Sequence, residues 1–435
     1  MKFENSLKIQ KRFRELVPGG CHTYAKGDDQ YPQFMPVYIA RGQGSHVWDL
    51  DGNEYIEYGM GLRTVTLGHA FEPIVEAAYR QMRLGNNYVR PAAIELECAE
   101  EFLSIIDGAD MVKFCKDGSD ATSGAVRLAR AYTGRDMVAI CGDQPFFAVD
   151  DWFIGSTPMA AGIPECTKAL TVAFRYNDIG SVKDLFGMYP GRIACIILEA
   201  EKYVPPEHDF LSQLQKVTHE NGAVFILDEM ITGFRWHLGG AQKKYDVVPD
   251  LSAFGKALGN GFAVSALAGK RDIMELGGLD HAKERVFLLS ATHGAENHAL
   301  AAAMATMRFY KEHPVIDTLY AQGRRLAEGV NQASAALGLS GHVSVIGPDC
   351  CSVYTTRDQA GNPSEAFRTL FLQETMKRGL LMPSSIVSYA HSDSDIDRTV
   401  ERISEALVVY RKALDEGIGK YIDGAPVKPV FRKFN

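Results

Sequence analysis

The alternation of short apolar runs with amphipathic helical segments between residues 110 and 270 most strongly constrains the fold. The runs that predict buried strands are 111–115, 137–141, 193–198, 223–227 and 263–268. Strands that are largely apolar along their length are typical of a parallel sheet covered by helices on both faces. The alternation therefore predicts an α/β fold with a mostly parallel sheet. Ligands of such sheets bind beyond the carboxyl ends of the strands.

The segments on either side of this region have patterns of their own. Residues 1–60 predict a helix and a hairpin with its turn at Asp51-Gly52, a pair favoured in tight hairpin turns. Residues 61–310 are expected to form the large sheet domain. Residues 311–435 predict helices near 316–337, 364–378 and 396–414 and short strands near 343–346 and 351–354. We expect this C-terminal part, with the N-terminal segment, to form a smaller α+β domain.

Composition excludes several classes of function. The 435 residues carry 46 Lys and Arg against 54 Asp and Glu, a formal net charge of −8. An acidic balance argues against a nucleic-acid partner, because binding to phosphate backbones needs a basic surface. The longest apolar stretch, 299–307, is too short to span a membrane. The eight cysteines are dispersed without a Cys-x-x-Cys pair, and the N-terminus lacks a signal-peptide core. We expect a cytoplasmic protein without a metal site.

The turn after the first strand has the composition of a phosphate-binding site. Gly118 and Ser119 open a helix that is expected to run to Tyr132 and to end at Gly134. Backbone N–H groups, a hydroxyl and the positive end of a helix dipole together suit an anion. The alternative interpretation is an ordinary helix N-cap, which Ser and Asp commonly supply.

Two further strand ends carry candidate ligand-binding side chains. Phe146 and Phe147 follow the second strand, and would stack on a planar ligand or pack in the core. Asp228 follows the fourth, where a buried carboxylate is costly unless a cation meets it. That cation would belong to a ligand or to an interior lysine or arginine.

Lys256 lies in a glycine-rich turn, Gly255-Lys256-Ala257-Leu258-Gly259. Desolvation lowers the pKa of a lysine and makes it a competent amine nucleophile, whereas the alternative is an exposed loop lysine. The P-loop and G-x-G-x-x-G patterns are both missing from the sequence. A phosphate site, an aromatic ring, a buried aspartate and an activated lysine at one sheet edge are what pyridoxal phosphate (PLP) requires.

The sequence resembles the class-III, fold-type-I PLP-dependent aminotransferases, and among them glutamate-1-semialdehyde 2,1-aminomutase and related enzymes. The resemblance covers nearly the whole chain. Its most specific stretches are 117–122, 127–135, 227–235 and 249–251 with Gly255-Lys256.

The resemblance implies a role for each candidate residue. Lys256 would form the Schiff base with the cofactor, and Asp228 would pair with its pyridine nitrogen. Gly118 and Ser119 would bind the phosphate. Phe146 stands where the family usually stacks a tyrosine on the ring.

The resemblance also implies a homodimer with shared active sites, because Thr292 stands where a threonine of the neighbouring subunit reaches the phosphate. Lys26 stands where the aminomutases carry an arginine, and Arg63 lies where the family lines its substrate pocket. A guanidinium binds carboxylate or phosphate through two parallel hydrogen bonds, which favours Arg63 as the substrate anchor.

One departure from the family concerns the reaction. Residues 382–391 lack the glutamate of the aminomutase gating loop. An open gate favours transfer of an amino group from an amino donor to a separate oxo or aldehyde acceptor. An intramolecular aminomutase is the alternative. A binding protein without chemistry is a third possibility, against which the intact Lys256 and Asp228 argue.

Overall fold

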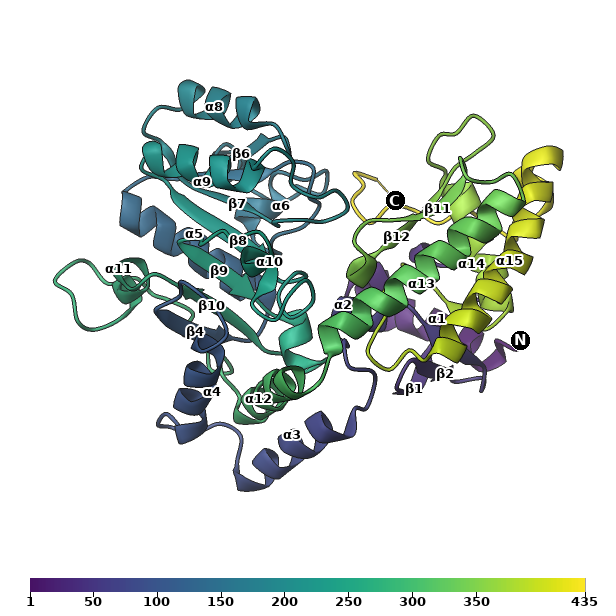
Figure 1. Ribbon diagram of the computed structural model, residues 1–435, viewed down its shortest axis with the longest axis horizontal. Coiled ribbons are helices and arrows are strands. Elements are labelled where there is room, and N and C mark those ends of the chain that lie inside the picture. Colours follow the sequence, from purple (N-terminus) through teal and green to yellow (C-terminus); the bar gives the residue numbers. More distant parts are fainter. Residues whose placement is uncertain (435) are drawn as a thin grey trace. The chain divides into compact units, whose positions relative to one another are not determined.

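The computed structural model describes residues 1–434, which form two compact units (Figure 1). The small unit combines Met1–Phe71 with the chain from Asp317 onward, and the large unit is Glu72–Ile316. Asn435, the last residue of the predicted 311–435 domain, lies outside the described residues. Within residues 1–434, no helix has the length and apolar character that crossing a membrane requires.

The large unit is built on a seven-stranded sheet (Figure 1). In spatial order its strands are β4 (Met111–Cys115), β10 (Ser265–Gly269), β9 (Leu251–Phe254), β8 (Val224–Glu229), β7 (Ile193–Leu198), β5 (Met137–Cys141) and β6 (Thr171–Phe174). Strands β9, β8, β7, β5 and β6 are parallel, and β10 is antiparallel to both of its neighbours. Every strand except β10 therefore ends at the same edge, where ligands of such sheets bind.

The large unit also contains helices. They are α3 (Glu72–Leu84), α4 (Ala93–Leu103), α5 (Gly118–Thr133), α6 (Asp151–Ile154), α7 (Glu165–Lys168), α8 (Ile179–Met188), α9 (Phe210–Glu220), α10 (Gly240–Lys244), α11 (Arg271–Met274) and α12 (Asn297–Glu312). Helix α5 contacts β4 and β7 to β10, and its inward positions such as Ala125 and Leu128 are buried. Tyr132, near the end of the helix, is exposed, and its hydroxyl donates to Asp272 Oδ2 at 2.9 Å.

The small unit has its own sheets and helices. A four-stranded sheet is ordered β1 (Ile39–Gln43), β2 (His46–Asp49), β3 (Glu54–Glu57) and β13 (Leu380–Leu381), and a separate hairpin pairs β11 (Val343–Ile346) with β12 (Val353–Thr356). The helices are α1 (Glu4–Leu16), α2 (Met60–Arg63), α14 (Glu365–Lys377) and α15 (Asp393–Glu416), and α13 (Val315–Ala336) enters this unit from the large one. This α+β arrangement agrees with the predicted class.

The strands differ in how well the sequence predicts them. Those at 111–115, 137–141 and 193–198 are confirmed with the expected bounds. The strands expected at 223–227 and 263–268 begin one or two residues later, and that expected at 351–354 is displaced by a 3₁₀ turn at Asp349–Cys351. Strands β6 and β9 were not predicted, because each is only four residues long and β6 is partly exposed.

Asp250, which directly precedes β9, binds side chains or backbone of three other segments of the large unit. Its Oδ2 accepts from Phe225 N in β8 and pairs with His219 Nε2 of α9, both at 2.8 Å, and its Oδ1 binds Lys270 Nζ at 2.5 Å.

We expect Asp250→Ala to lower the melting temperature by several degrees, because it leaves a buried N–H and a lysine without their acceptor, a loss of about 2–4 kcal/mol. Differential scanning calorimetry would measure this. Asp184→Ala, at an exposed position of helix α8 in the same unit, is the matched control, and an equal effect of both changes would contradict the assignment.

Candidate active site

The register of the sheet brings the predicted turns to one edge. Leu198 of β7 pairs with Leu227 of β8, and Glu229 of β8 pairs with Phe254 of β9. Through Ala266 of β10, which pairs with both strands, Phe254 at the end of β9 is level with Phe114, one residue before the end of β4. Asp228, the turn that carries Lys256 and the turn that carries Gly118 therefore lie at the same edge.

Asp228 is a buried acid at this edge with a strongly raised pKa. It is 3% exposed, and its Oδ1 accepts a hydrogen bond from Met230 N at 2.9 Å. Burial, and then the charge of Glu199, raise the pKa of Asp228 to about 7, whereas the charge of Lys256 lowers it. A second cation at this carboxylate would relieve the cost of its burial.

Lys256 stands in a strained and crowded turn. It begins a 3₁₀ turn (Lys256–Gly259) with φ of +44°, a left-handed conformation that is costly for a residue with a side chain. The preceding Gly255 admits no side chain, because a Cβ there would lie 2.5 Å from Ser265 Oγ and 2.7 Å from Met230 Sδ. A Cβ on Gly118 would also lie 2.7 Å from Met230 Sδ. Met230 therefore packs against both the lysine turn and the predicted phosphate turn.

The N-terminus of α5 is capped in the way that the alternative interpretation proposed. Asp117 Oδ1 accepts from Ser119 N at 2.8 Å and from Asp120 N at 3.1 Å. The Ser119 hydroxyl oxygen accepts a hydrogen bond from Val149 N at 3.0 Å, and its own proton can therefore be donated to a bound anion.

The two phenylalanines after β5 have different environments. Phe147 is buried, whereas Phe146 is 41% exposed. Both rings meet Phe153 edge to face, with centroid distances of 5.7 Å for Phe146 and 5.5 Å for Phe147. Phe147 thus belongs to the core, and Phe146 offers a ring face that a planar ligand would cover.

Glu199 is a site residue that the sequence analysis missed. It directly follows β7, its side chain is 4% exposed, and its Oε1 lies 3.0 Å from Lys202 Nζ. The Gln144 side chain binds both the N–H and the carbonyl of Glu199, at 2.7 and 2.6 Å. The signal in the sequence is the one that identified Asp228, an acid at the end of a continuous apolar run.

Thr292 lies in the large unit, on the loop before α12. Its side chain is exposed, and its carbonyl oxygen accepts from Asn87 Nδ2 at 3.0 Å. The loop is further tied to the phosphate turn by an ion pair between Glu296 and Lys116.

Arg63 and Lys26 belong to the small unit. Arg63 ends α2, a turn in which Met60, Gly61, Leu62 and Arg63 all have positive φ, at 41°, 57°, 58° and 72°. A left-handed turn costs roughly 1–2 kcal/mol for each residue other than glycine, and strain of this kind is found mainly at functional sites. Lys26 is exposed at the end of a 3₁₀ turn, Tyr24–Lys26.

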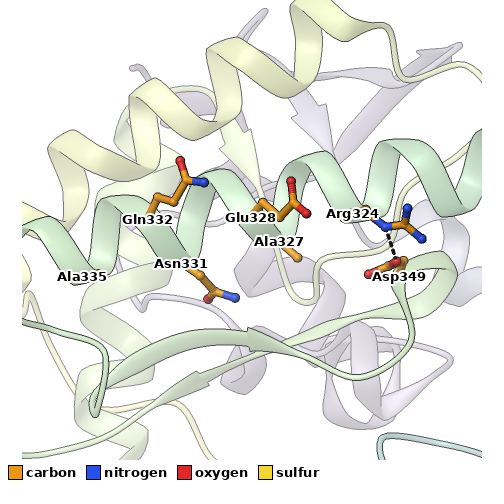
Figure 2. A pocket seen from close by; sticks show the side chains of 7 residues that line it. All are labelled: Arg324, Ala327, Glu328, Asn331, Gln332, Ala335 and Asp349. Carbon is orange, nitrogen blue, oxygen red and sulfur yellow. Dashed lines mark hydrogen bonds and ion pairs between the residues drawn. The ribbon is translucent and has the colours of Figure 1, made fainter.

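A groove of about 540 Å³ on the surface of α13 contains none of these residues (Figure 2). It is lined by Arg324, Ala327, Glu328, Asn331, Gln332, Ala335 and Asp349. Arg324 pairs with Asp349 at 3.1 Å, and both oxygen and nitrogen of the Asn331 amide bind the backbone of Val345. Because these groups already bind one another and the backbone, we do not assign the groove as the active site.

Comparisons with known proteins agree with this geometry. Residues 26–407 match the family model of class-III aminotransferases. Glutamate-1-semialdehyde 2,1-aminomutase of Persephonella marina is 31% identical over 93% of this chain and 99% of its own, and that of Desulfitobacterium hafniense is 32% identical over 93% and 98%. Among solved structures, the PLP form of Sphingopyxis sp. MTA144 FumI protein has a TM-score of 0.87 at 27% identity, covering 94% and 97% of the two chains. An omega-transaminase from Sphaerobacter thermophilus has a TM-score of 0.84 at 25% identity, covering 93% and 98%.

The raised pKa of Asp228 predicts a pH-dependent stability of the cofactor-free protein. Between the unfolded pKa, about 3.9, and the folded value of about 7, the folded state binds more protons than the unfolded state. The stability of the folded state therefore falls as the pH rises through this window. Above pH 7 the full cost of burying the ionised Asp228 carboxylate remains. We expect cofactor-free Asp228→Asn to melt several degrees above the wild type at pH 8 and at the same temperature near pH 4. Melting curves across this range would check the prediction, and a pH-independent difference would contradict it.

Proposed function

The chain belongs to the class-III aminotransferase family and is a PLP-dependent enzyme, and from this premise we propose that it transfers an amino group from an amino donor to a separate oxo or aldehyde acceptor. The observation that carries the proposal is the buried Asp228 at the same sheet edge as the strained Lys256 turn. A carboxylate there suits a cationic ring nitrogen, and a lysine there suits an aldehyde.

The residues present fit the cofactor. The bound cofactor supplies an aldehyde that takes up the amino group and a ring that withdraws electrons from the substrate. We assign to Lys256 the attachment of the cofactor and the movement of a proton at the substrate carbon. Asp228 holds the proton of the ring nitrogen, because its buried carboxylate favours a cation beside it.

Three residues of the large unit are proposed to hold the rest of the cofactor. The exposed ring face of Phe146 packs on the pyridine ring. Gly118 and Ser119 receive the phosphate at the start of α5, where the helix dipole and the Ser119 hydroxyl favour an anion.

Arg63 and Lys26 are proposed to bind an acidic group of a substrate. The left-handed turn supports the role of Arg63, since such strain persists where a side chain has to be held in one place. A guanidinium also provides two parallel hydrogen bonds to a carboxylate, whereas the exposed Lys26 provides a single charge.

We propose that the protein is a homodimer with shared active sites, and that an exposed apolar surface of the large unit forms its interface. Val75, Tyr79 and Met82 are exposed on one face of α3, while Ile74 and Ala78 on its other face are buried. Leu84, Val89 and Leu96, at the end of α3 and in the residues that follow it, are exposed as well. Asn87, within the same region, binds the Thr292 carbonyl. A second copy that covered this surface would therefore meet the Thr292 loop, as a threonine acting in the partner's site requires.

We propose a cytoplasmic location. All eight cysteines are unpaired, and the thiol of Cys166 is exposed. An exposed thiol persists in a reducing compartment and is oxidised outside it.

An intramolecular aminomutase is the second candidate, because the relatives at 31–32% identity carry that name. Against it stands the segment 382–391, which has no carboxylate and in which Ile386 and Val387 are buried. An aminomutase has to retain its intermediate until the amine has moved, which an acid-gated loop would assist.

Supplying an amino donor alone tests the reaction. The lysine-bound cofactor is expected to absorb at roughly 420 nm. We expect this band to disappear when an amino donor is added and to return when an oxo acceptor is added. The steady-state kinetics should be of the two-substrate ping-pong type. Lys256→Ala should lack that absorbance and lose several orders of magnitude in turnover. Efficient isomerisation of glutamate-1-semialdehyde without a second substrate would establish the aminomutase instead.

Replacing each proposed anchor separately tests the substrate site. Arg63→Ala should raise KM for one of the two substrates about tenfold to a hundredfold with kcat little changed, because a charged hydrogen bond is worth about 1.5–3 kcal/mol. Lys26→Ala, at the other proposed anchor, should have the smaller effect, and Arg12→Ala, at an exposed cation with no assigned role, is the matched control. Steady-state kinetics with each substrate varied would measure all three, and unchanged constants in Arg63→Ala would refute the anchor.

Replacing Thr292 tests the proposed shared site. Thr292→Val should weaken retention of the cofactor by about 1–3 kcal/mol while the dimer persists, because only a hydrogen bond to a charged group is lost. Equilibrium dialysis and analytical ultracentrifugation would measure the two quantities, with Ser290→Ala on the same exposed loop as the control. A wild type that is monomeric and saturated with cofactor would disprove the proposal.

A further inference from the structure

Glu199 and Asp228 form a pair of carboxylates on neighbouring strands. Leu198 and Leu227 are register partners in β7 and β8, so the residues that follow them are level with each other and point to the same face. Both residues are 3% exposed. Two acids are thus buried side by side at the edge where the cofactor binds.

The hydrogen bonds of Glu199 are incomplete. Its Oε1 is bound by Lys202, whereas its Oε2 has no hydrogen-bond partner within residues 1–434. Glu229, a neighbouring carboxylate that is also buried, accepts from Thr232 Oγ1, Ala241 N and Gln242 N, and so fixes the start of α10. Glu229 therefore has a structural role that its hydrogen bonds explain, and Glu199 does not.

We propose that Glu199 is a positioning residue whose buried charge acts on Asp228, so that the two carboxylates together keep the ring nitrogen of the bound cofactor protonated. The inference rests on the proposed function. It assigns to Glu199 no contact with the substrate or with the reacting atoms, only an electrostatic effect through Asp228.

The charges around the pair are consistent with this role. The titratable groups that face the two carboxylates are Lys202 on the loop after β7, Lys256 after β9, Cys141 at the end of β5 and Tyr176 after β6. Burial raises the pKa of the Cys141 thiol to about 12, so this group is neutral, and it raises the pKa of Tyr176 as well. When Lys256 is attached to the cofactor, Asp228, Glu199 and Lys202 together carry one net negative charge, which a protonated ring nitrogen would neutralise.

The protonation of the ring nitrogen tests the inference directly. The enzyme would be loaded with PLP labelled with ¹⁵N in the ring, and the nitrogen shift followed against pH by solid-state NMR. In Glu199→Gln, an isosteric neutral variant, we expect the pH at which the proton is lost to fall by about one unit, a tenfold change in proton affinity. Glu207→Gln, at an exposed position on the same loop, is the matched control and should leave it unchanged.

A second variant and a second ligand keep the test decisive if Glu199→Gln folds poorly. Lys202→Met removes the cation that offsets Glu199 and should shift the proton loss in the opposite direction. Binding of PLP to the cofactor-free protein should weaken about tenfold in Glu199→Gln, while binding of the analogue with C–H in place of the ring nitrogen should not change.

The possible results separate the inference from the function on which it rests. An unchanged nitrogen titration in Glu199→Gln, or equal weakening of both ligands, would show a merely structural role and overturn the inference. A shift in the same direction in Lys202→Met would overturn it as well. A wild type that binds no PLP would overturn the proposed function itself, and the inference with it.

Discussion

The burial of carboxylates at the ends of β7 and β8 is the constraint on which the rest of the site depends. An unpaired buried charge costs several kcal/mol, and continuous apolar strands leave it no access to water. Lysines on two turns offset part of this cost. A cation bound at this edge would relieve the remainder, so in the proposed site the cost of burying these carboxylates would favour the protonated ring of the cofactor. The parallel sheet makes this possible, because it ends its strands at one edge without exposing their backbone to water.

The sequence predicted five of the seven strands of the large sheet and placed Asp228 and the Lys256 turn at its edge. Apolar strands such as 193–198 are visible because they are buried on both faces. Strand β9 was missed because its four residues, which include Ser252, show no recognisable hydrophobic pattern, although the turn that follows the strand carries Lys256. Glu199 was missed because its significance depends on the pairing of β7 with β8, which only the fold determines. The left-handed conformation of 60–63 has just one signal in the sequence, Gly61, since Met60, Leu62 and Arg63 seldom adopt it. The roles of Phe146 and Thr292 stay predictions.

The residues proposed for the cofactor and those proposed for a substrate come from different parts of the chain. Those assigned to the cofactor lie in the large unit, and those assigned to the substrate, Arg63 and Lys26, lie in the small one. Changes in the small unit would therefore alter which acid is recognised without disturbing the edge at which the chemistry occurs. Such separation is one way in which a single fold comes to serve many substrates.

The turn at 60–63 also bears on how this protein would respond to engineering or to selection at high temperature. Replacing Leu62 or Arg63 with glycine would relieve left-handed strain, so a search guided by stability alone would favour glycine at both positions. At position 63 that choice would remove the guanidinium. If Arg63 binds a substrate as proposed, thermal adaptation of this chain is expected to retain a locally unfavourable backbone here and to gain its stability elsewhere. The turn would then mark the proposed substrate site in sequences that have diverged from this one.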